Sequence, residues 1–391
     1  MSFKQPALTG WALCYLIAAD MRLLACLLFL ALAARLAVAV EAEPAPNMTT
    51  TTTVSARDPR IAYLGRIALA GAGARMGFPG ITVRFVYRGP APVIRLSASS
   101  ATCYFNLACN GWEPVMIHLN QGENEIALPT GKAPATGWLI ELVRRTESWQ
   151  GVATFEGLKL PPGCELLPPP PWPERKLLFI GDSITCGECV ERFPPEDLPT
   201  PRSANAARSF GMLLGRWLGA QVQLVSYGGR GVMRDWQGST DVANAPQFFQ
   251  RALPDDPESR WNPADYSPDA IVVCLGQNDY SKDLPDEALY TKAYGDFVDE
   301  VRATHPHAAL ILGELSLFGE TPGTLDRAKR DQLNRVIETI AAQRRAAGDR
   351  RIAAAPVHYY PGTPTNAHPV AFQHEQIALD LLGPIRALTG W

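Results

Sequence analysis

The 391-residue chain has little excess charge of either sign, since 36 Lys and Arg stand against 39 Asp and Glu, a net charge of −3. A protein that binds nucleic acid or an anionic membrane usually carries a basic face, so the composition favours neither partner. Histidine is scarce, at six residues, and no Cys/His set has the spacing of a four-ligand zinc site. No internal repeat is evident. The sequence therefore predicts no metal and no cofactor, while its 47% hydrophobic content is ample for folded cores.

The N-terminal residues 1–42 are predicted to be a secretory signal with a possible upstream extension. From Met21, one arginine precedes an apolar run that ends in small residues around Ala37-Val38-Ala39, the pattern of a cleaved signal. We expect a secreted or periplasmic protein with no membrane association after signal removal. Removal leaves six of the eight cysteines. Cys103 and Cys109 could close a small loop, and Cys186 and Cys189 are either a local bridge or two unreactive thiols.

Two folded regions are expected after a Pro/Thr-rich linker at 43–57. The first, 58–165, alternates apolar and polar residues between turn signals, which indicates an antiparallel β-sandwich. Its candidate strands lie at 81–89, 92–99, within 113–128, and at 137–145. Consecutive prolines within 166–175 then predict a stiff hinge.

The second region, 176–391, alternates buried strands with helical patterns. The expected strands are 177–180, 221–225, 270–275, 308–313 and 351–356, and the expected helices are 206–219, 286–304, 324–347 and 371–387. This order predicts an α/β domain with a parallel sheet that helices flank on both faces. Functional groups in such sheets gather beyond the carboxyl ends of the strands.

Four chemically useful residues fall at that edge. Ser183 ends the run "LLFIGDS", Gly231 lies in "GGRGV", Asn278 in "GQND", and His368 stands before the last helix. A serine hydroxyl becomes a nucleophile when a neighbouring base such as histidine takes its proton. Backbone N–H groups and an amide NH₂ can stabilise the oxyanion that forms on a carbonyl under attack. The run contains neither the long glycine loop nor the lysine of a phosphate-binding site.

These blocks resemble the SGNH (GDSL) hydrolases, which contribute Ser, Gly, Asn and His in this order. "IGDSITCG", "GRGVMRDW", "VVCLGQNDYS", "ELVRRTES" and the closing "GW" resemble carbohydrate esterase family 2, across about residues 58–391. The resemblance implies a jelly-roll-like sandwich followed by an SGNH-type sheet. It also implies Ser183 as the nucleophile, His368 as the base, and an oxyanion hole of Ser183 N–H, Gly231 and Asn278.

The sequence departs from the family pattern beside the histidine. SGNH enzymes usually place an aspartate three residues before it, where this chain has Thr365, and Asn366-Ala367 stand where related esterases often have Asp-Trp. A backbone carbonyl or the Asn366 side chain would then orient His368 in a Ser-His dyad. Arg234 and Trp236, beside the glycine turn, are candidates for sugar contact.

The sequence thus favours an exported serine esterase that removes acetyl groups from a polysaccharide or oligosaccharide of the xylan or glucomannan type. Three alternatives stay open. They are a lipase or thioesterase on the same scaffold, a carbohydrate-binding protein with a degenerate hydrolase domain, and an acetyltransferase.

Overall fold

The computed structural model describes residues 50–128, 134–192, 200–363 and 366–391. The predicted signal and position 365 lie outside the described residues. Residues Thr50–Trp391 belong to one compact unit. Within the described ranges, none of the helices is both long and apolar enough to cross a bilayer.

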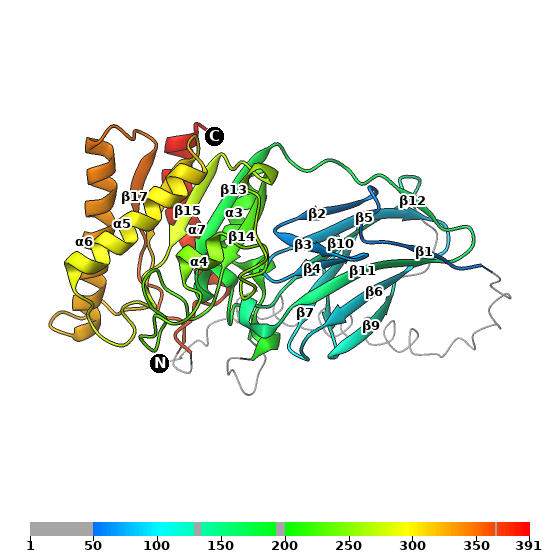
Figure 1. Cartoon of the computed structure of the whole chain (residues 1–391), viewed down its shortest axis with the longest axis horizontal. Helices are drawn as coiled ribbons and strands as arrows, with labels where there is room; N and C mark the ends of the chain where they lie inside the picture. Colours follow the sequence, from blue (N-terminus) through cyan, green and yellow to red (C-terminus); the bar gives the residue numbers. More distant parts are fainter. Residues whose placement is uncertain (1–49, 129–133, 193–199, 364–365) are drawn as a thin grey trace, which may run out of the picture. The chain divides into compact units, whose positions relative to one another are not determined.

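The first half of this unit is the expected antiparallel β-sandwich (Figure 1). One sheet has the order β3-β4-β11-β6-β9 with β1 on β11, and the other has the order β12-β5-β10-β7-β8 with β2 on β5. Strand β10 shows why the sequence folds this way, because Trp138, Ile140 and Leu142 are buried while the residues between them are half-exposed. The strands are β1 Thr52–Val54, β2 Ile61–Leu64, β3 Ile67–Ala70, β4 Gly73–Met76, β5 Thr82–Arg88, β6 Val93–Ala98, β7 Tyr104–Cys109, β8 Val115–His118, β9 Gly122–Ala127, β10 Trp138–Arg144, β11 Ala153–Leu160 and β12 Glu165–Leu167.

Two of these strands extend into segments expected to be linker or hinge. Thr52–Val54 pairs antiparallel with β11, and Glu165–Leu167 pairs with β5. Both segments are short edge strands. The β-branched Thr-Thr-Val suits a pleated edge, and this preference prevails locally over the polar character of the surrounding tract.

The second half is the expected parallel sheet, with the strand order β14-β13-β15-β16-β17. Its strands are β13 Arg175–Gly181, β14 Ala220–Ser226, β15 Ala270–Cys274, β16 Ala309–Glu314 and β17 Ile352–Pro356. The helices are α2 Ser183–Cys186, α3 Phe210–Leu218, α4 Ala245–Phe249, α5 Glu287–Thr304, α6 Leu325–Ala346 and α7 Ala371–Thr389. The one-turn helices α2 and α4 are not among the helices expected from the sequence.

Helices cover both faces of the sheet, which is why its strands are apolar throughout. In β13, Leu177 and Phe179 pack into the cluster with α3 and α7, whereas Leu178 and Ile180 pack into the cluster with α4, α5 and α6. Figure 1 shows α5 and α6 on one side of the strands and α7 on the other. This arrangement leaves the carboxyl ends of β13, β14 and β15 free to carry a site.

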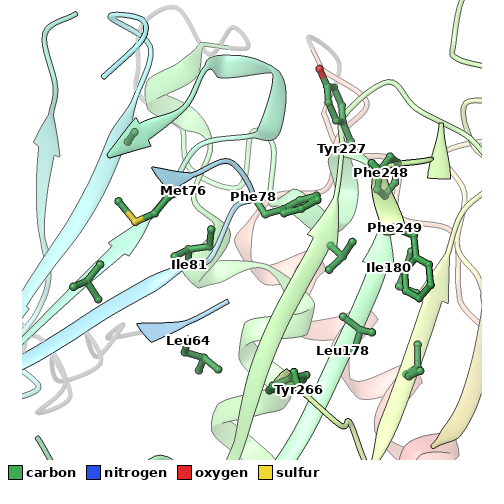
Figure 2. Close-up of a cluster of buried hydrophobic side chains, with 14 of the residues drawn as sticks. Leu64, Met76, Phe78, Ile81, Leu178, Ile180, Tyr227, Phe248, Phe249 and Tyr266 are labelled. Carbon is green, nitrogen blue, oxygen red and sulfur yellow. The ribbon is translucent and has the colours of Figure 1, made fainter. Parts of the chain in front are cut away.

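The sandwich and the parallel sheet share one hydrophobic core. Figure 2 shows Met76, Phe78 and Ile81 of the sandwich beside Ile180 and Phe248 of the second region. The Phe78 and Phe248 rings meet edge to face, with their centroids 6.4 Å apart. Such packing makes the sandwich a fixed wall beside the sheet.

Candidate active site

Ser183 is placed by the abrupt change from β13 to α2. Strand β13 ends at Gly181, where a Cβ would lie 2.0 Å from Thr185 Oγ1, so only glycine allows this close approach. Asp182 caps the helix, since its Oδ1 accepts a hydrogen bond of 3.0 Å from the Ile184 N–H. The helix ends after one turn at Gly187, which has φ +79°. Ser183 is therefore held in the first turn of α2 at the carboxyl edge of the sheet.

The structure brings His368 to Ser183 across 185 positions of sequence. The distance between Ser183 Oγ and His368 Nε2 is 2.9 Å. On the other side of the ring, Nδ1 lies 3.0 Å from Asn366 Oδ1, which also accepts the His368 backbone N–H at 3.0 Å. An amide oxygen accepts a hydrogen, so this contact places the ring hydrogen on Nδ1 and leaves the Nε2 lone pair facing the serine.

The glycine turn after β14 is fixed by the carboxylate of Asp279. Its oxygens accept backbone N–H groups of Val232 (2.9 Å), Met233 (2.7 Å) and Arg234 (3.0 Å). A Cβ on Gly231 would lie 2.1 Å from Asp279 Oδ2, so a side chain at that position would collide with the carboxylate. Gly231 itself is buried and is not among the residues that line the cavity described below, whereas Gly228, Gly229 and Arg230 are.

Asn278 follows β15 and links Asp182, the residue before Ser183, to the glycine turn. Its Nδ2 donates to Arg230 O at 2.9 Å and, more weakly, to Asp182 Oδ2 at 3.3 Å. Burial is the main reason that the pKa of Asp182 is raised to about 7 and that of Asp279 to about 6. The carboxyl groups beneath the site are thus held in an environment that resists full ionisation.

A cavity of about 570 Å³ opens over these residues. Ser183, Asn278 and His368 line it, and two tryptophans stand at its walls. Trp236 is 55% exposed and follows the glycine turn, whereas Trp149 is 51% exposed and comes from the sandwich. Indole rings that remain exposed beside a polar cavity offer flat apolar faces to a ligand.

The sandwich reaches the site through the segment at 147–149. Ser148 Oγ donates a hydrogen bond of 2.7 Å to Ser226 O at the end of β14. Glu147 is buried under Gly228, where a Cβ would lie 1.9 Å from its Oε2. Burial, and then the nearby Glu188 carboxylate, hold the pKa of Glu147 well above its usual range. Glu188 in turn lines the cavity with its Oε2 3.4 Å from His368 Nε2.

The remaining predicted residues lie apart from this geometry. The Arg234 guanidinium donates to Asp279 O and to Asp283 and does not line the cavity. The cysteines at 103, 109, 164, 186, 189 and 274 are all free thiols, so the described residues contain neither of the bridges considered. Sequence reasoning missed Trp149 and Glu188. The motif "ELVRRTES" ends one residue before Trp149, and Glu188 stands in "GEC", shortly after Ser183. The sequence alone does not show that both side chains face the same cavity.

A strand-to-helix serine paired with a histidine before the last helix defines the GDSL class of acyl hydrolases. The chain matches the "GDSL-like Lipase/Acylhydrolase family" over residues 179–363 and the "Carbohydrate esterase 2 N-terminal" family over residues 63–170. It is 33% identical over 342 residues to the acetylxylan esterase / glucomannan deacetylase of Cellvibrio japonicus (strain Ueda107), covering 87% of this chain and 92% of that protein.

Solved structures of family two carbohydrate esterases also resemble this chain. A family two carbohydrate esterase from Cellvibrio japonicus superposes with a TM-score of 0.80 at 33% identity, covering 88% of this chain and 99% of that one. One from Clostridium thermocellum, in complex with cellohexaose, shares the fold at 24% identity and a TM-score of 0.76, covering 85% and 99%. The chain belongs to carbohydrate esterase family 2 and is a carbohydrate ester hydrolase.

Proposed function

We propose that the protein is an exported esterase that removes acetyl groups from a xylan- or glucomannan-type polysaccharide with a Ser183–His368 dyad. The observation that carries this proposal is the 2.9 Å contact between Ser183 Oγ and His368 Nε2 at the base of a cavity. The names of the Cellvibrio japonicus relative support the substrate class. The sequence pattern of residues 1–42 supports export.

In the first half of the reaction, Ser183 Oγ attacks the acetyl carbonyl carbon while His368 Nε2 takes the hydroxyl proton. The carbonyl oxygen becomes an oxyanion. We assign its stabilisation to the Ser183 N–H, to Asn278 Nδ2 and to a backbone N–H of the glycine turn that contains Gly231. Oxyanion binding would replace the longer of the two Asn278 contacts, the one to Asp182.

Collapse of this intermediate breaks the bond to the sugar oxygen, and His368 returns the proton to that oxygen as the alcohol leaves. Water then attacks the acetyl-serine, His368 takes a proton from the water, and acetate departs as Ser183 recovers its hydroxyl. Asn366 keeps the hydrogen of the ring on Nδ1 throughout. A neutral amide stabilises the imidazolium less than an aspartate does, and the Glu188 carboxylate, 3.4 Å from Nε2, supplies negative charge from the cavity side.

The cavity walls favour a sugar over a long acyl chain. Trp149 and Trp236 can stack on pyranose faces, and Gln237, Gln277 and Ser281 offer hydrogen-bonding groups between them. The aliphatic side chain of Leu317 is the exception in this lining. A lipase would need a continuous apolar channel at this position.

The test compares wild type, Ser183→Ala and His368→Ala on acetylated xylan, acetylated glucomannan and a long-chain nitrophenyl ester. The proposal expects acetate release from a polysaccharide by wild type alone. Turnover of only the long-chain ester would favour the lipase. Binding of xylan without turnover by wild type would favour the binding protein, and acetyl transfer to an added oligosaccharide in place of acetate release would favour the acetyltransferase.

A further inference from the structure

Three potential metal ligands converge beside the catalytic pair. One ring nitrogen of His368, one carboxylate oxygen of Glu188 and Cys189 Sγ all lie within 4.8 Å of one another, and His368 Nε2 is 3.4 Å from Glu188 Oε2. Among the described residues, this is the one group of three that could hold an ion. The reaction proposed above uses His368 and the Glu188 charge but has no role for the Cys189 thiol.

The backbone of Cys189, which directly follows Glu188, is held in an unusual conformation. Its φ is +56°, and the other described non-glycine residue with positive φ is Asn110. Asparagine adopts this left-handed region readily, whereas cysteine does not. The thiol is nearly buried and accepts a contact of 3.7 Å from Ser203 Oγ. The fold therefore keeps a sulfur atom at the edge of the site at a cost in backbone energy.

The donor set selects a borderline or soft divalent ion. Zinc binds thiolate, imidazole and carboxylate at about 2.0–2.3 Å, which puts tetrahedral ligand atoms roughly 3–4 Å apart. Glu188 Oε2 and His368 Nε2 already lie within this range, at 3.4 Å, and Cys189 Sγ lies within 4.8 Å of the ligand atoms of both residues. Magnesium and calcium prefer oxygen ligands throughout, so the sulfur disfavours them.

The surroundings leave space for one ion and a path to it. Glu188 and His368 line the main cavity, through which an ion can enter. Cys189, Asn366 and His368 also line a small recess of about 10 Å³, close to the volume of one small bound particle. Arg192 and Glu191 also line this recess, and Glu191 is paired with Arg145 and Arg208, which leaves the Glu188 carboxylate to face the ion.

We propose that Cys189, Glu188 and His368 form a zinc-binding site that switches the esterase off. Zinc displaces the thiol proton into solvent and occupies the Nε2 lone pair, so that His368 no longer accepts the proton of Ser183. A water molecule or Ser183 Oγ, 2.9 Å from Nε2, would complete a tetrahedral shell. Inhibition rests on the proposed esterase function, whereas binding of the ion does not.

The first test is optical and needs no substrate. Co²⁺ is added to the full-length mature protein, and the near-ultraviolet thiolate-to-cobalt charge-transfer band is recorded before and after Zn²⁺ is added. Wild type should show a band that zinc removes. Cys189→Gly, which suits the positive φ, and Cys189→Ala should lack it. Cys164→Ala changes a partly exposed thiol outside both cavities and should keep it.

The second test is acetate release with and without zinc. Wild type should lose activity in micromolar zinc and regain it with a chelator. Cys189→Gly should match wild type without metal and should need at least about tenfold more zinc for the same inhibition. A band that persists in Cys189→Gly, or no band in wild type, overturns the site. Equal zinc sensitivity of Cys189→Gly and wild type would overturn the proposed switch. If the wild-type protein hydrolyses none of the esters, the proposed esterase function is wrong, and the cobalt band still shows whether the metal site exists.

Discussion

Replacing Gly231 by alanine should disable the oxyanion hole while leaving Ser183 and His368 in place. The new Cβ would lie 2.1 Å from Asp279 Oδ2, 2.4 Å from Asp279 Cγ and 2.5 Å from Arg234 O. Contacts below 3.0 Å are not tolerated, so the carboxylate or the turn must move by about 1 Å. Asp279 also accepts hydrogen bonds from the next three N–H groups of that turn. A shift of the carboxylate therefore displaces the backbone of the whole glycine turn, including the N–H group that we assign to the oxyanion hole.

The size of the effect follows from the geometry of oxyanion donors. They act at about 2.7–3.1 Å, and a shift of about 1 Å breaks such a bond. Loss of one donor costs about 2.7–4 kcal/mol of transition-state stabilisation, so kcat should fall roughly 10²–10³-fold with little change in KM.

The assay is steady-state acetate release from acetylated xylan oligosaccharides and from 4-nitrophenyl acetate, with circular dichroism to show that the variant is folded. Gly383→Ala is the matched control. It makes the same change within α7, where a Cβ meets no atom within 4 Å, and should leave kcat unchanged. A folded Gly231→Ala enzyme with wild-type kcat would refute this account of the turn.

Three further predictions follow from particular contacts. Asn366→Ala removes the acceptor 3.0 Å from His368 Nδ1 and should lower kcat at least about tenfold with KM nearly unchanged; a fall confined to KM would contradict this role. Trp149→Ala should raise KM for acetylated xylan roughly 5–30-fold, about 1–2 kcal/mol, without affecting 4-nitrophenyl acetate; equal losses on both substrates would contradict a sugar contact. Burial, and then Arg66, lower the pKa of His305 to about 4. Its contribution to stability is therefore lost as pH falls from about 6.5 to about 4, so His305→Phe should be roughly 1–3 kcal/mol less acid-sensitive in urea unfolding than wild type; identical pH profiles would contradict this.

Strong periodicity made the fold predictable. The parallel strands appear within two residues of the expected ranges, because a strand buried on both faces must be apolar along its whole length. Edge strands such as Thr52–Val54 were not predictable, since their stability comes from pairing with a distant partner, β11. The short helix Ala245–Phe249 is too brief to show a helical period.

The candidate site, too, has residues that could be placed from the sequence and residues that could not. Residues at strand ends, such as Ser183 and Asn278, could be placed from the sequence because parallel topology brings those ends to one edge. Trp149 could not, because it reaches the cavity from the other half of the molecule through a shared core. The threefold bonding of Asp279 also depends on how a glycine turn folds back, and the sequence letters do not encode that path locally.

The most direct test of the central claim is to locate the covalent adduct formed with a fluorophosphonate. Peptide mapping by mass spectrometry should place the adduct on Ser183 in wild type and find no adduct in Ser183→Ala, with much slower labelling of His368→Ala. An adduct on another residue, or labelling of Ser183→Ala at the wild-type rate, would contradict the assignment of Ser183 as the nucleophile.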